Sequence, residues 1–353
     1  MTIHIGLIGA GNISETHARA ASAIPGVAIA GVYAPTRAHA ERLSAQYGAT
    51  ACDTLDRLLD HRPLDLVVVG SPSGLHAEHG IAAAAHGVHV LVEKPIDVST
   101  AKADALIDAA ARAGVTLGVI FQDRLKPGPQ QLKTLVDAGR LGRPILATAQ
   151  VKWYRSPEYY GASRWRGTQA LDGGGALMNQ GVHTVDLLLW LFGPVRRVSA
   201  RIATALHAIE VEDTAVAVVE FANGAVGTIE ATTAAYPGYS RRIELTGSEG
   251  TVVLDGDRLA SVDLIGSGGP GGSGGSGGAG AANAASGSSA ATASASSPVV
   301  ADASAHQRVL EDFIRAVTSR TAPCCDGGEG RRSVALIEAI YASSRSNKAI
   351  DLM

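Results

Sequence analysis

Lys94, a candidate catalytic residue, follows a short apolar run. Lys94 lies in Glu93-Lys94-Pro95, directly after the strand-like residues 90–92, and is one of six lysines in 353 residues. A solvated surface charge poorly explains a lysine that runs straight out of a buried strand. An ammonium group held in a binding crevice can stabilise negative charge that develops during a reaction. A cis Lys94–Pro95 bond would aim it into the crevice at the sheet edge.

A second polar group lies in the apolar, glycine-led segment 173–186. On an α-helix, Asn179 and His183 are four residues apart and share a face, and Asp186 is placed to orient the imidazole. A histidine in an apolar helix is more often a satisfied core residue, so this spacing alone leaves both interpretations open. As a catalyst, His183 would take a hydroxyl proton, because its pKa lies near the working pH.

The glycine-rich turn at residues 6–14, Gly-Leu-Ile-Gly-Ala-Gly-Asn-Ile-Ser, closes the first strand-like run and precedes a helix-like stretch. Glycines at such a turn let backbone N–H groups approach a pyrophosphate, and the helix N-terminus favours the anion. Ser14 replaces the third glycine and is small enough for close packing. The turn predicts a dinucleotide site with contacts from Gly9, Gly11, Asn12 and Ile13.

The residues after the second strand-like run indicate which nicotinamide cofactor binds. An NAD site usually carries a carboxylate here for the ribose hydroxyls, but this sequence continues from Tyr33 as Ala-Pro-Thr-Arg. Arg37 would pair with a 2′-phosphate, and Thr36 would add a hydroxyl. We therefore favour NADP over NAD, although Arg37 is also a common kind of residue at a helix start.

The elements that must hold these residues follow from the apolar pattern. Five short runs rich in Val, Ile and Leu alternate with helix-like stretches up to residue 121, which predicts a doubly wound parallel sheet. The runs are 3–9, 27–33, 66–70, 88–92 and 115–121. The turns after the third and fourth runs, 70–76 and 93–95, then lie at the ligand-binding edge.

The second half changes character and predicts an α+β domain around an open antiparallel sheet. Its expected strands are 145–153, 198–203, 214–221, 225–233, 241–246 and 251–254, and its expected helices are 130–138, 175–191, 305–318 and 330–343. The predicted domains are 1–122 for the nucleotide and 123–353 for substrate and oligomerisation. Residues 266–298 hold only small or polar residue types and predict a flexible surface loop.

Composition excludes several classes of protein. Thirty basic against 33 acidic residues give a net charge of −3, so no nucleic-acid partner is expected. No apolar run is long enough to span a membrane, and no leader is recognisable. Three cysteines, Cys52, Cys324 and Cys325, favour a reducing, cytoplasmic setting. No metal site is expected.

These motifs together resemble the Gfo/Idh/MocA family of glucose–fructose oxidoreductase, inositol dehydrogenase and rhizopine catabolism proteins. The resemblance runs from Gly6 to Leu352 except in the low-complexity stretch, and its most specific parts are 70–76, 93–95 and 173–186. It implies a Rossmann domain, a second domain whose open sheet forms a homodimer or homotetramer interface, a nicotinamide cofactor and a sugar or cyclitol substrate.

The resemblance also implies roles for individual residues. It assigns Lys94 and His183 as catalytic, while Asn179 stands where the family often has an aspartate, as in a subset similar to nucleotide-sugar and amino-sugar dehydrogenases. Asparagine cannot carry a proton, so Asn179 is expected to bind substrate. The remaining expected cofactor contacts are Ser71, Pro72, His76, Glu93, Lys94 itself and Gln122.

An aromatic, arginine-rich segment suggests the substrate. Residues 152–166 hold two of the three tryptophans and three of the eight tyrosines. Aromatic rings pack on sugar faces and arginines bind carboxylate or phosphate, so an acidic sugar is favoured, although a structural loop or subunit contact fits as well. The expected substrate contacts are Tyr154, Arg155, Arg164, Trp165, Arg124 and Tyr236.

The leading hypothesis is an NAD(P)-dependent dehydrogenase or reductase acting on a secondary alcohol of a sugar, sugar acid, nucleotide sugar or cyclitol. Hydride chemistry belongs to the nicotinamide. Two alternatives share the resemblance: an NAD-dependent glycosidase with tightly held cofactor, and a catalytically silent NAD(P)- and sugar-sensing regulator. Retention of both Lys94 and His183 argues against the regulator.

Overall fold

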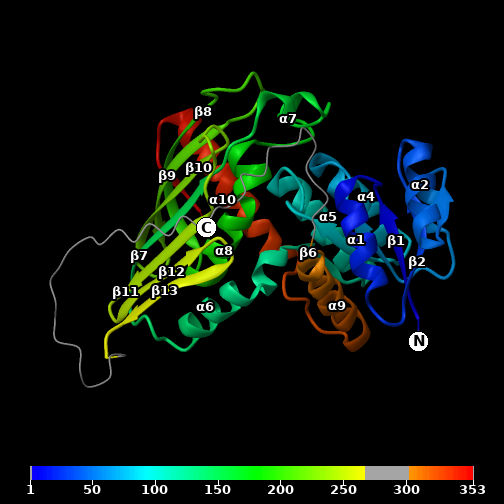
Figure 1. Ribbon diagram of the computed structural model, residues 1–353, viewed down its shortest axis with the longest axis horizontal. Coiled ribbons are helices and arrows are strands. Elements are labelled where there is room, and N and C mark those ends of the chain that lie inside the picture. Colours follow the sequence, from blue (N-terminus) through cyan, green and yellow to red (C-terminus); the bar gives the residue numbers. More distant parts are fainter. Residues whose placement is uncertain (1, 267–301, 353) are drawn as a thin grey trace.

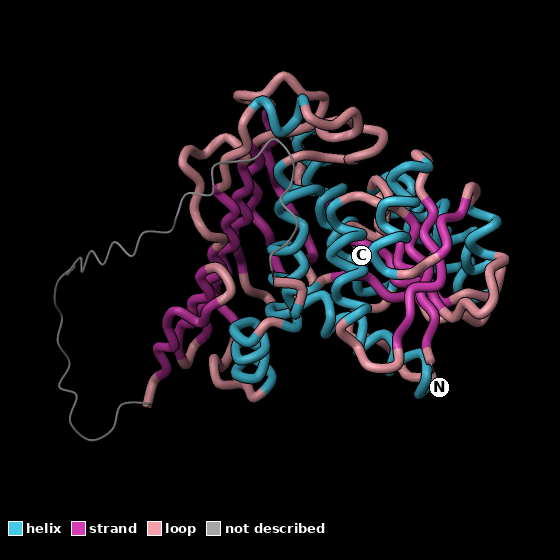
Figure 2. The backbone as a smooth tube through the Cα atoms, turned by 45° about the vertical axis from the view of Figure 1, so that its right-hand side comes forward, coloured by secondary structure: helices cyan, strands magenta, loops and turns pink. Residues whose placement is uncertain are grey.

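The computed structural model describes residues 2–266 and 302–352 as two sheets with helices packed on each (Figures 1 and 2). Apart from Gly266, the predicted loop at 266–298 lies outside the described residues. Within the described part of the chain, no helix is long and apolar enough to cross a membrane.

The first sheet is six-stranded, parallel and ordered β3-β2-β1-β4-β5-β6, which confirms the predicted doubly wound fold. Its strands are β1 Ile3–Ile8, β2 Val27–Tyr33, β3 Thr50–Cys52, β4 Leu66–Val69, β5 His89–Glu93 and β6 Leu117–Ile120. Only β3 was not predicted, because its three residues are too few to show a pattern.

Helices cover both faces of this sheet, which explains its continuous apolar strands. Along β4, Val67 and Val69 face one core while Leu66 and Val68 face the other. The helices are α1 Asn12–Ser22, α2 Arg37–Tyr47, α3 Leu55–Leu59, α4 His76–Ala85 and α5 Thr100–Ala113, with the short 3₁₀ turns η1 Ser73–Leu75 and η2 Gln122–Leu125.

The second sheet is mostly antiparallel, as predicted, except that β7 and β10 pair in parallel; it has eight strands, of which β13 and β14 were not predicted. Its order is β13-β12-β11-β7-β10-β9-β8-β14. The strands are β7 Pro144–Lys152, β8 Val195–Ala203, β9 Thr214–Phe221, β10 Val226–Thr232, β11 Arg242–Gly247, β12 Gly250–Asp255, β13 Arg258–Leu264 and β14 Ile350–Asp351. Alternation along β9 buries Ala215, Ala217 and Val219, so only one face enters the core.

The helices of the second domain are α6 Pro127–Asp137, α7 Pro157–Gly161, α8 Val182–Phe192 and α10 Gly327–Ser346. The predicted helix 175–191 is interrupted: it begins as a π-helical turn, η3 Ala176–Gly181, and only then becomes α8. Asn179 therefore lies on the π turn and His183 on α8, and the single α-helix that the four-residue spacing assumed does not form.

The helix α9, Ser304–Ser319, was assigned with the second domain but packs its apolar side on the first sheet. Val309, Leu310 and Phe313 belong to the same buried cluster as the β1 side chains Ile5 and Leu7. In Figure 1 this orange helix lies below α1 and β6. The chain therefore returns to the nucleotide domain after β13, before α10 and β14 complete the second domain.

Replacing Phe313 with alanine should destabilise the protein by about 3–5 kcal/mol, because a large ring leaves a filled core. The ring is 1% exposed, and a Cβ on Gly118 would lie 2.7 Å from its Cδ2. Denaturant unfolding followed by circular dichroism measures the loss. Thr318→Ala, at an exposed position of α9, is the control and should change little. An unchanged midpoint for Phe313→Ala would contradict this packing.

Candidate active site

The glycine-rich turn forms a tight cradle between β1 and α1. Gly9 has a φ of +113°, and a Cβ there would lie 2.6 Å from the Gly70 carbonyl oxygen, so only glycine fits. Gly11 has open space where a Cβ would stand. A backbone cradle at a helix N-terminus fits a pyrophosphate. Asn12 and Ile13 begin α1 here, and the buried Oε1 of Gln122 lacks a hydrogen-bond partner among the described residues.

His76 joins two turns at the edge of the first sheet. Its Nδ1 lies 2.7 Å from the Pro95 carbonyl oxygen and its Nε2 lies 2.9 Å from the Ser71 carbonyl oxygen. With both nitrogens beside backbone carbonyls and the ring buried, His76 holds the turns together instead of reaching a cofactor. Ser71 Oγ in turn lies 2.9 Å from Nδ1 of His79, and Pro72 precedes η1.

The structure gives the predicted 2′-phosphate site no support. Arg37 is exposed at the start of α2, and its guanidinium already pairs with Glu41 and Asp53, each at 2.7 Å. Thr36 is the N-cap residue of α2. A 2′-phosphate beside Arg37 would therefore meet two carboxylates. The sequence argument did not consider Asp53, because this residue is distant from Arg37 in the chain: it follows β3, the strand that pairs with β2.

Lys94 is held where β5 ends. Its Nζ donates a 3.0 Å hydrogen bond to the Asn179 carbonyl oxygen, and its backbone N–H donates to Glu93 Oε2 at 3.0 Å. The Lys94–Pro95 bond is cis, as predicted. Glu93 is buried and accepts a 2.8 Å hydrogen bond from His17 of α1. The predicted cofactor residue Glu93 thus fixes the lysine turn against the nucleotide helix.

A buried glutamate shapes the π turn that carries Asn179. Glu212 Oε2 accepts from Gly175 N–H at 3.0 Å and its Oε1 accepts from Leu177 N–H at 2.8 Å. A Cβ on Gly175 would lie 2.0 Å from the Glu212 carbonyl oxygen, so the glycine run permits this approach. Tyr341 of α10 also donates to Glu212.

Asp172, at the start of this segment, is a site residue that the sequence argument did not select. Its carboxylate accepts from the Asn179 side-chain amide at 2.5 Å and from Gly167 N–H at 2.8 Å. Burial raises the pKa of Asp172 to about 6, although these hydrogen bonds and the Lys94 charge oppose the rise. The sequence signal that could have identified Asp172 is its position directly before three glycines.

His183 lies at the start of α8 and faces a different carboxylate from the one predicted. Its Nδ1 is 3.7 Å from Asp123 Oδ2, and the Phe121 ring meets it edge-on with centroids 5.8 Å apart. Burial lowers the pKa of His183 to about 3, while Asp123 opposes and Lys94 adds to the fall. His183 is therefore neutral at working pH, and the expectation that its pKa lies near that pH was wrong, because burial disfavours the charged imidazolium.

Arg124 does not fit the predicted substrate contact. It is 2% exposed, and its Nε and Nη2 donate to both oxygens of Asp186 at 2.8 and 2.6 Å. This pair ties η2 to α8, with Glu329 of α10 3.2 Å from the same guanidinium. Asp186 is consequently committed to Arg124 and does not orient His183.

The other predicted substrate residues lie in three places. Arg155 approaches the site, because its Nη2 donates to Gln180 Oε1 at 2.8 Å beside Asn179, and it lies over the Trp153 and Tyr159 rings. Tyr154 and Tyr236 meet edge-on at 5.3 Å on the neighbouring surface. Arg164 is exposed and Trp165 half-buried on the loop after α7, where Trp165 contacts Arg166.

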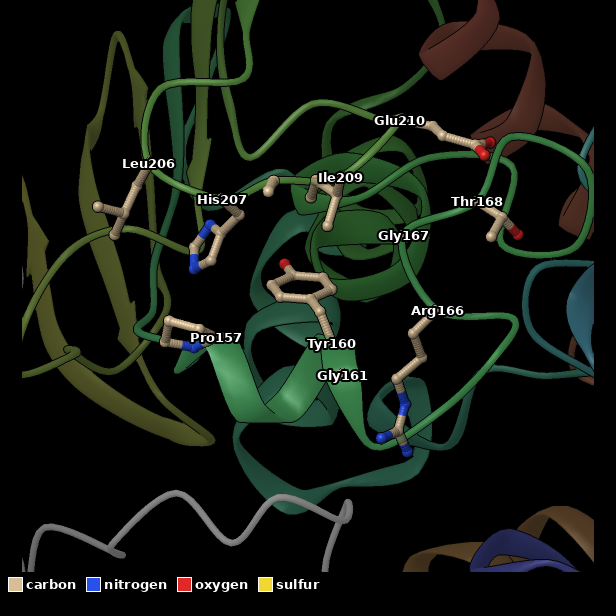
Figure 3. A pocket seen from close by; sticks show the side chains of 11 residues that line it. Pro157, Tyr160, Gly161, Arg166, Gly167, Thr168, Leu206, His207, Ile209 and Glu210 are labelled. Carbon is tan, nitrogen blue, oxygen red and sulfur yellow. The ribbon is translucent and has the colours of Figure 1, made fainter.

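Two cavities adjoin these residues. One of about 680 Å³ reaches His183, Asp123 and Gln122 between η2, the end of β7 and α9. The other, of about 760 Å³, lies beside α7; Figure 3 shows Tyr160 at its centre with His207 and Ile209 above and Arg166 at its lower edge. Neither Lys94 nor His183 lines this second cavity. The described residues contain no cluster of three metal-binding side chains.

Two family models match the chain. Residues 3–121 match the oxidoreductase family model for the NAD-binding Rossmann fold of the GFO/IDH/MocA group, and residues 130–253 match the GFO/IDH/MocA C-terminal domain.

Individual proteins are similar over most of the chain. The WlbA dehydrogenase of Bordetella pertussis, solved in complex with NADH and UDP-GlcNAcA, is 32% identical with a TM-score of 0.86, covering 100% of this chain and 99% of that one. The uncharacterized oxidoreductase YrbE of Bacillus subtilis is 30% identical over 73% of this chain and 75% of its own. Inositol 2-dehydrogenase 2 of Saccharopolyspora erythraea is 30% identical over 72% of this chain and 74% of its own.

Replacing Glu93 with glutamine should destabilise the protein in a pH-dependent way. Burial alone would raise the pKa of Glu93, but His17, His306 and Lys94 lower it to about 2 from 4.5. A lowered carboxyl pKa contributes stability above the unfolded-state pKa, and that stability is lost as pH falls through 4.5 toward 2.

The expected loss for Glu93→Gln is about 3 kcal/mol near neutral pH, and it should shrink clearly at a pH of about 3.5. Urea unfolding at both pH values measures it. Glu78→Gln, an exposed glutamate on α4, is the control and should have little effect at either pH. The same destabilisation by Glu93→Gln at both pH values would show that its charge is not the cause.

Proposed function

The chain belongs to the Gfo/Idh/MocA family of NAD(P)-dependent oxidoreductases, and from this we propose that it oxidises a secondary alcohol of an acidic nucleotide sugar with NAD⁺. The proposal rests on the contact between Lys94 and the π turn η3, which directly precedes His183. Lys94 Nζ reaches across from the nucleotide domain to the Asn179 carbonyl oxygen at 3.0 Å. A cation and a neutral imidazole thus adjoin the edge where parallel sheets bind ligands.

Each of the two residues has a separate task in the proposed reaction. Lys94 donates a hydrogen bond to the substrate hydroxyl and stabilises the negative charge that develops on that oxygen. His183, neutral because burial lowers its pKa to about 3, accepts the hydroxyl proton. A bound nicotinamide supplies the acceptor for the hydride. Asn179 cannot carry a proton, and because its amide already binds Asp172 and Gln180, the proposed reaction does not use it as the substrate contact that the sequence argument expected.

Two features support an acidic nucleotide sugar as the substrate class. Arg155 stands beside Gln180 with its guanidinium between two aromatic rings, and its buried Nε lacks a hydrogen-bond partner among the described residues. An arginine in this setting suits a carboxylate or phosphate. The full-length likeness to a WlbA dehydrogenase bound to UDP-GlcNAcA supports the same class.

We propose NAD as the cofactor, in place of the NADP favoured by the sequence argument. Arg37 is paired by Glu41 and Asp53, so its charge is offset at the point where a 2′-phosphate would bind. The WlbA relative was solved with NADH.

The three cysteines are unpaired thiols, which supports a reducing setting such as the cytoplasm.

The outward face of the second sheet supports a homodimer or a homotetramer. Leu146, Val216, Val218 and Val226 are 42–55% exposed on adjoining strands β7, β10 and β9. Contiguous apolar side chains on an exposed sheet mark an interaction surface. We place the subunit interface there.

Replacing Lys94 with alanine should lower kcat on the order of a hundredfold or more, because the developing alkoxide loses its cation. Cofactor reduction is followed at 340 nm with NAD⁺ and with NADP⁺, against UDP-GlcNAcA, uronates, neutral aldoses and inositols. Activity should be greatest with NAD⁺ and UDP-GlcNAcA. Lys133→Ala, on α6 and paired with Asp137, is the control and should keep full activity. No turnover in any combination would refute the proposal.

Replacing Val218 with aspartate should convert a dimer to monomers, or a tetramer to smaller species, because the face would then bury a charge without a partner. Analytical ultracentrifugation measures the mass. Val218→Thr, which keeps the shape without a charge, should stay assembled. A wild-type protein that sediments as a monomer would remove the proposed interface.

A further inference from the structure

Asp123 of η2 is a buried carboxylate that faces His183 and has no assigned role. Its Oδ2 lies 3.7 Å from His183 Nδ1, and the two side chains are 6% and 13% exposed. That separation exceeds a hydrogen bond, and Nδ1 has no partner within hydrogen-bond distance among the described residues. Catalytic hydrogen bonds are often this long before substrate binds and shorten in the complex.

Other polar groups near His183 are already committed. Asp186 binds Arg124 through both of its oxygens. The Asn179 amide donates to Asp172 and accepts from Gln180. Asp123 is therefore the carboxylate that the fold leaves facing the imidazole.

Two cations hold Asp123 in place and keep it ionised. Arg241 donates to its Oδ2, and Lys126 Nζ lies 2.6 Å from its Oδ1. Burial alone would raise the pKa of Asp123, but His183, Arg241 and Lys126 together hold it well below its usual range. Arg241 and Lys126 both also bind Asp257, which is half exposed, so two carboxylates share two cations.

We propose that Asp123 is the positioning residue of His183: its carboxylate keeps the imidazole hydrogen on Nδ1 and leaves the lone pair of Nε2 to take the substrate proton. This inference rests on the proposed dehydrogenase function. A neutral imidazole has a single N–H hydrogen, and the hydrogen-bond partner of one ring nitrogen decides which nitrogen carries it. When Nε2 takes the proton, the carboxylate also stabilises the resulting imidazolium.

The test compares Asp123→Asn with Asp257→Asn, which removes the other carboxylate of the same two cations without touching His183. Protein labelled with ¹⁵N-histidine is studied by NMR, with the His183 signal assigned through His183→Gln. Wild type and Asp257→Asn should hold the hydrogen on Nδ1. Asp123→Asn should shift the population toward Nε2, and Asp123→Glu should restore Nδ1.

Kinetics provide the second readout. Asp123→Asn should lower kcat on the order of a hundredfold or more, with KM changed less than about threefold; the same kind of tautomer change costs about 10⁴-fold in catalytic triads. Asp257→Asn should keep kcat within about threefold of wild type, and Asp123→Glu should recover part of the loss.

Three results would overturn the inference: wild-type His183 with its hydrogen on Nε2, an unchanged tautomer in Asp123→Asn, or an equal loss of kcat in Asp257→Asn. The NMR measurement needs no substrate. If the sugar panel shows no turnover, the proposed function fails on its own evidence while the His183 tautomer still decides the role of Asp123. If Asp123→Asn does not fold, wild type and Asp123→Glu decide it.

Discussion

The arrangement of this site depends on one buried carboxylate, that of Glu93. It accepts from His17 of the nucleotide helix and from the backbone of Lys94, so one side chain joins the cradle of α1 to the reactive lysine. A buried charge is tolerable only when it is paired and hydrogen-bonded. Both partners come from the first domain, so Glu93 fixes the backbone at Lys94 within that domain, and the Asn179 carbonyl oxygen of the second domain then holds the Lys94 ammonium.

The surroundings separate three buried acids that are chemically alike. Glu93 has its pKa lowered to about 2 by His17, His306 and Lys94 against the effect of burial, and Asp123 is lowered further by Arg241 and Lys126. At Asp172 the hydrogen bonds and the charges of Lys94 and Arg166 oppose burial, but burial prevails and raises its pKa to about 6. The balance between burial and nearby charges, not the residue type, sets which acid can hold a proton near neutral pH.

Sequence reasoning succeeded where local pattern decides the structure and failed where distant segments meet. Apolar runs revealed the strands, and Lys94 stood out as a scarce residue at a strand end. The interruption at η3 depends on Glu212, far along the chain, and could not be seen in residues 175–191. Asp186 was assigned to His183 by helical spacing, but Arg124, 62 residues earlier, takes it. The packing of α9 on the first sheet is a tertiary choice that an amphipathic pattern leaves open.

The π turn explains why the acid beside His183 comes from another element. Residue 179 lies where an α-helix would set its side chain one turn before His183, but η3 turns the Asn179 amide toward Asp172 instead. An aspartate at 179 would face the Asp172 carboxylate in a buried setting, and two carboxylates that close cannot both ionise. Asparagine avoids this repulsion and donates a hydrogen bond. The charge that His183 requires must then come from outside the helix, and η2, held to α8 by the Arg124–Asp186 pair, brings Asp123 to that place.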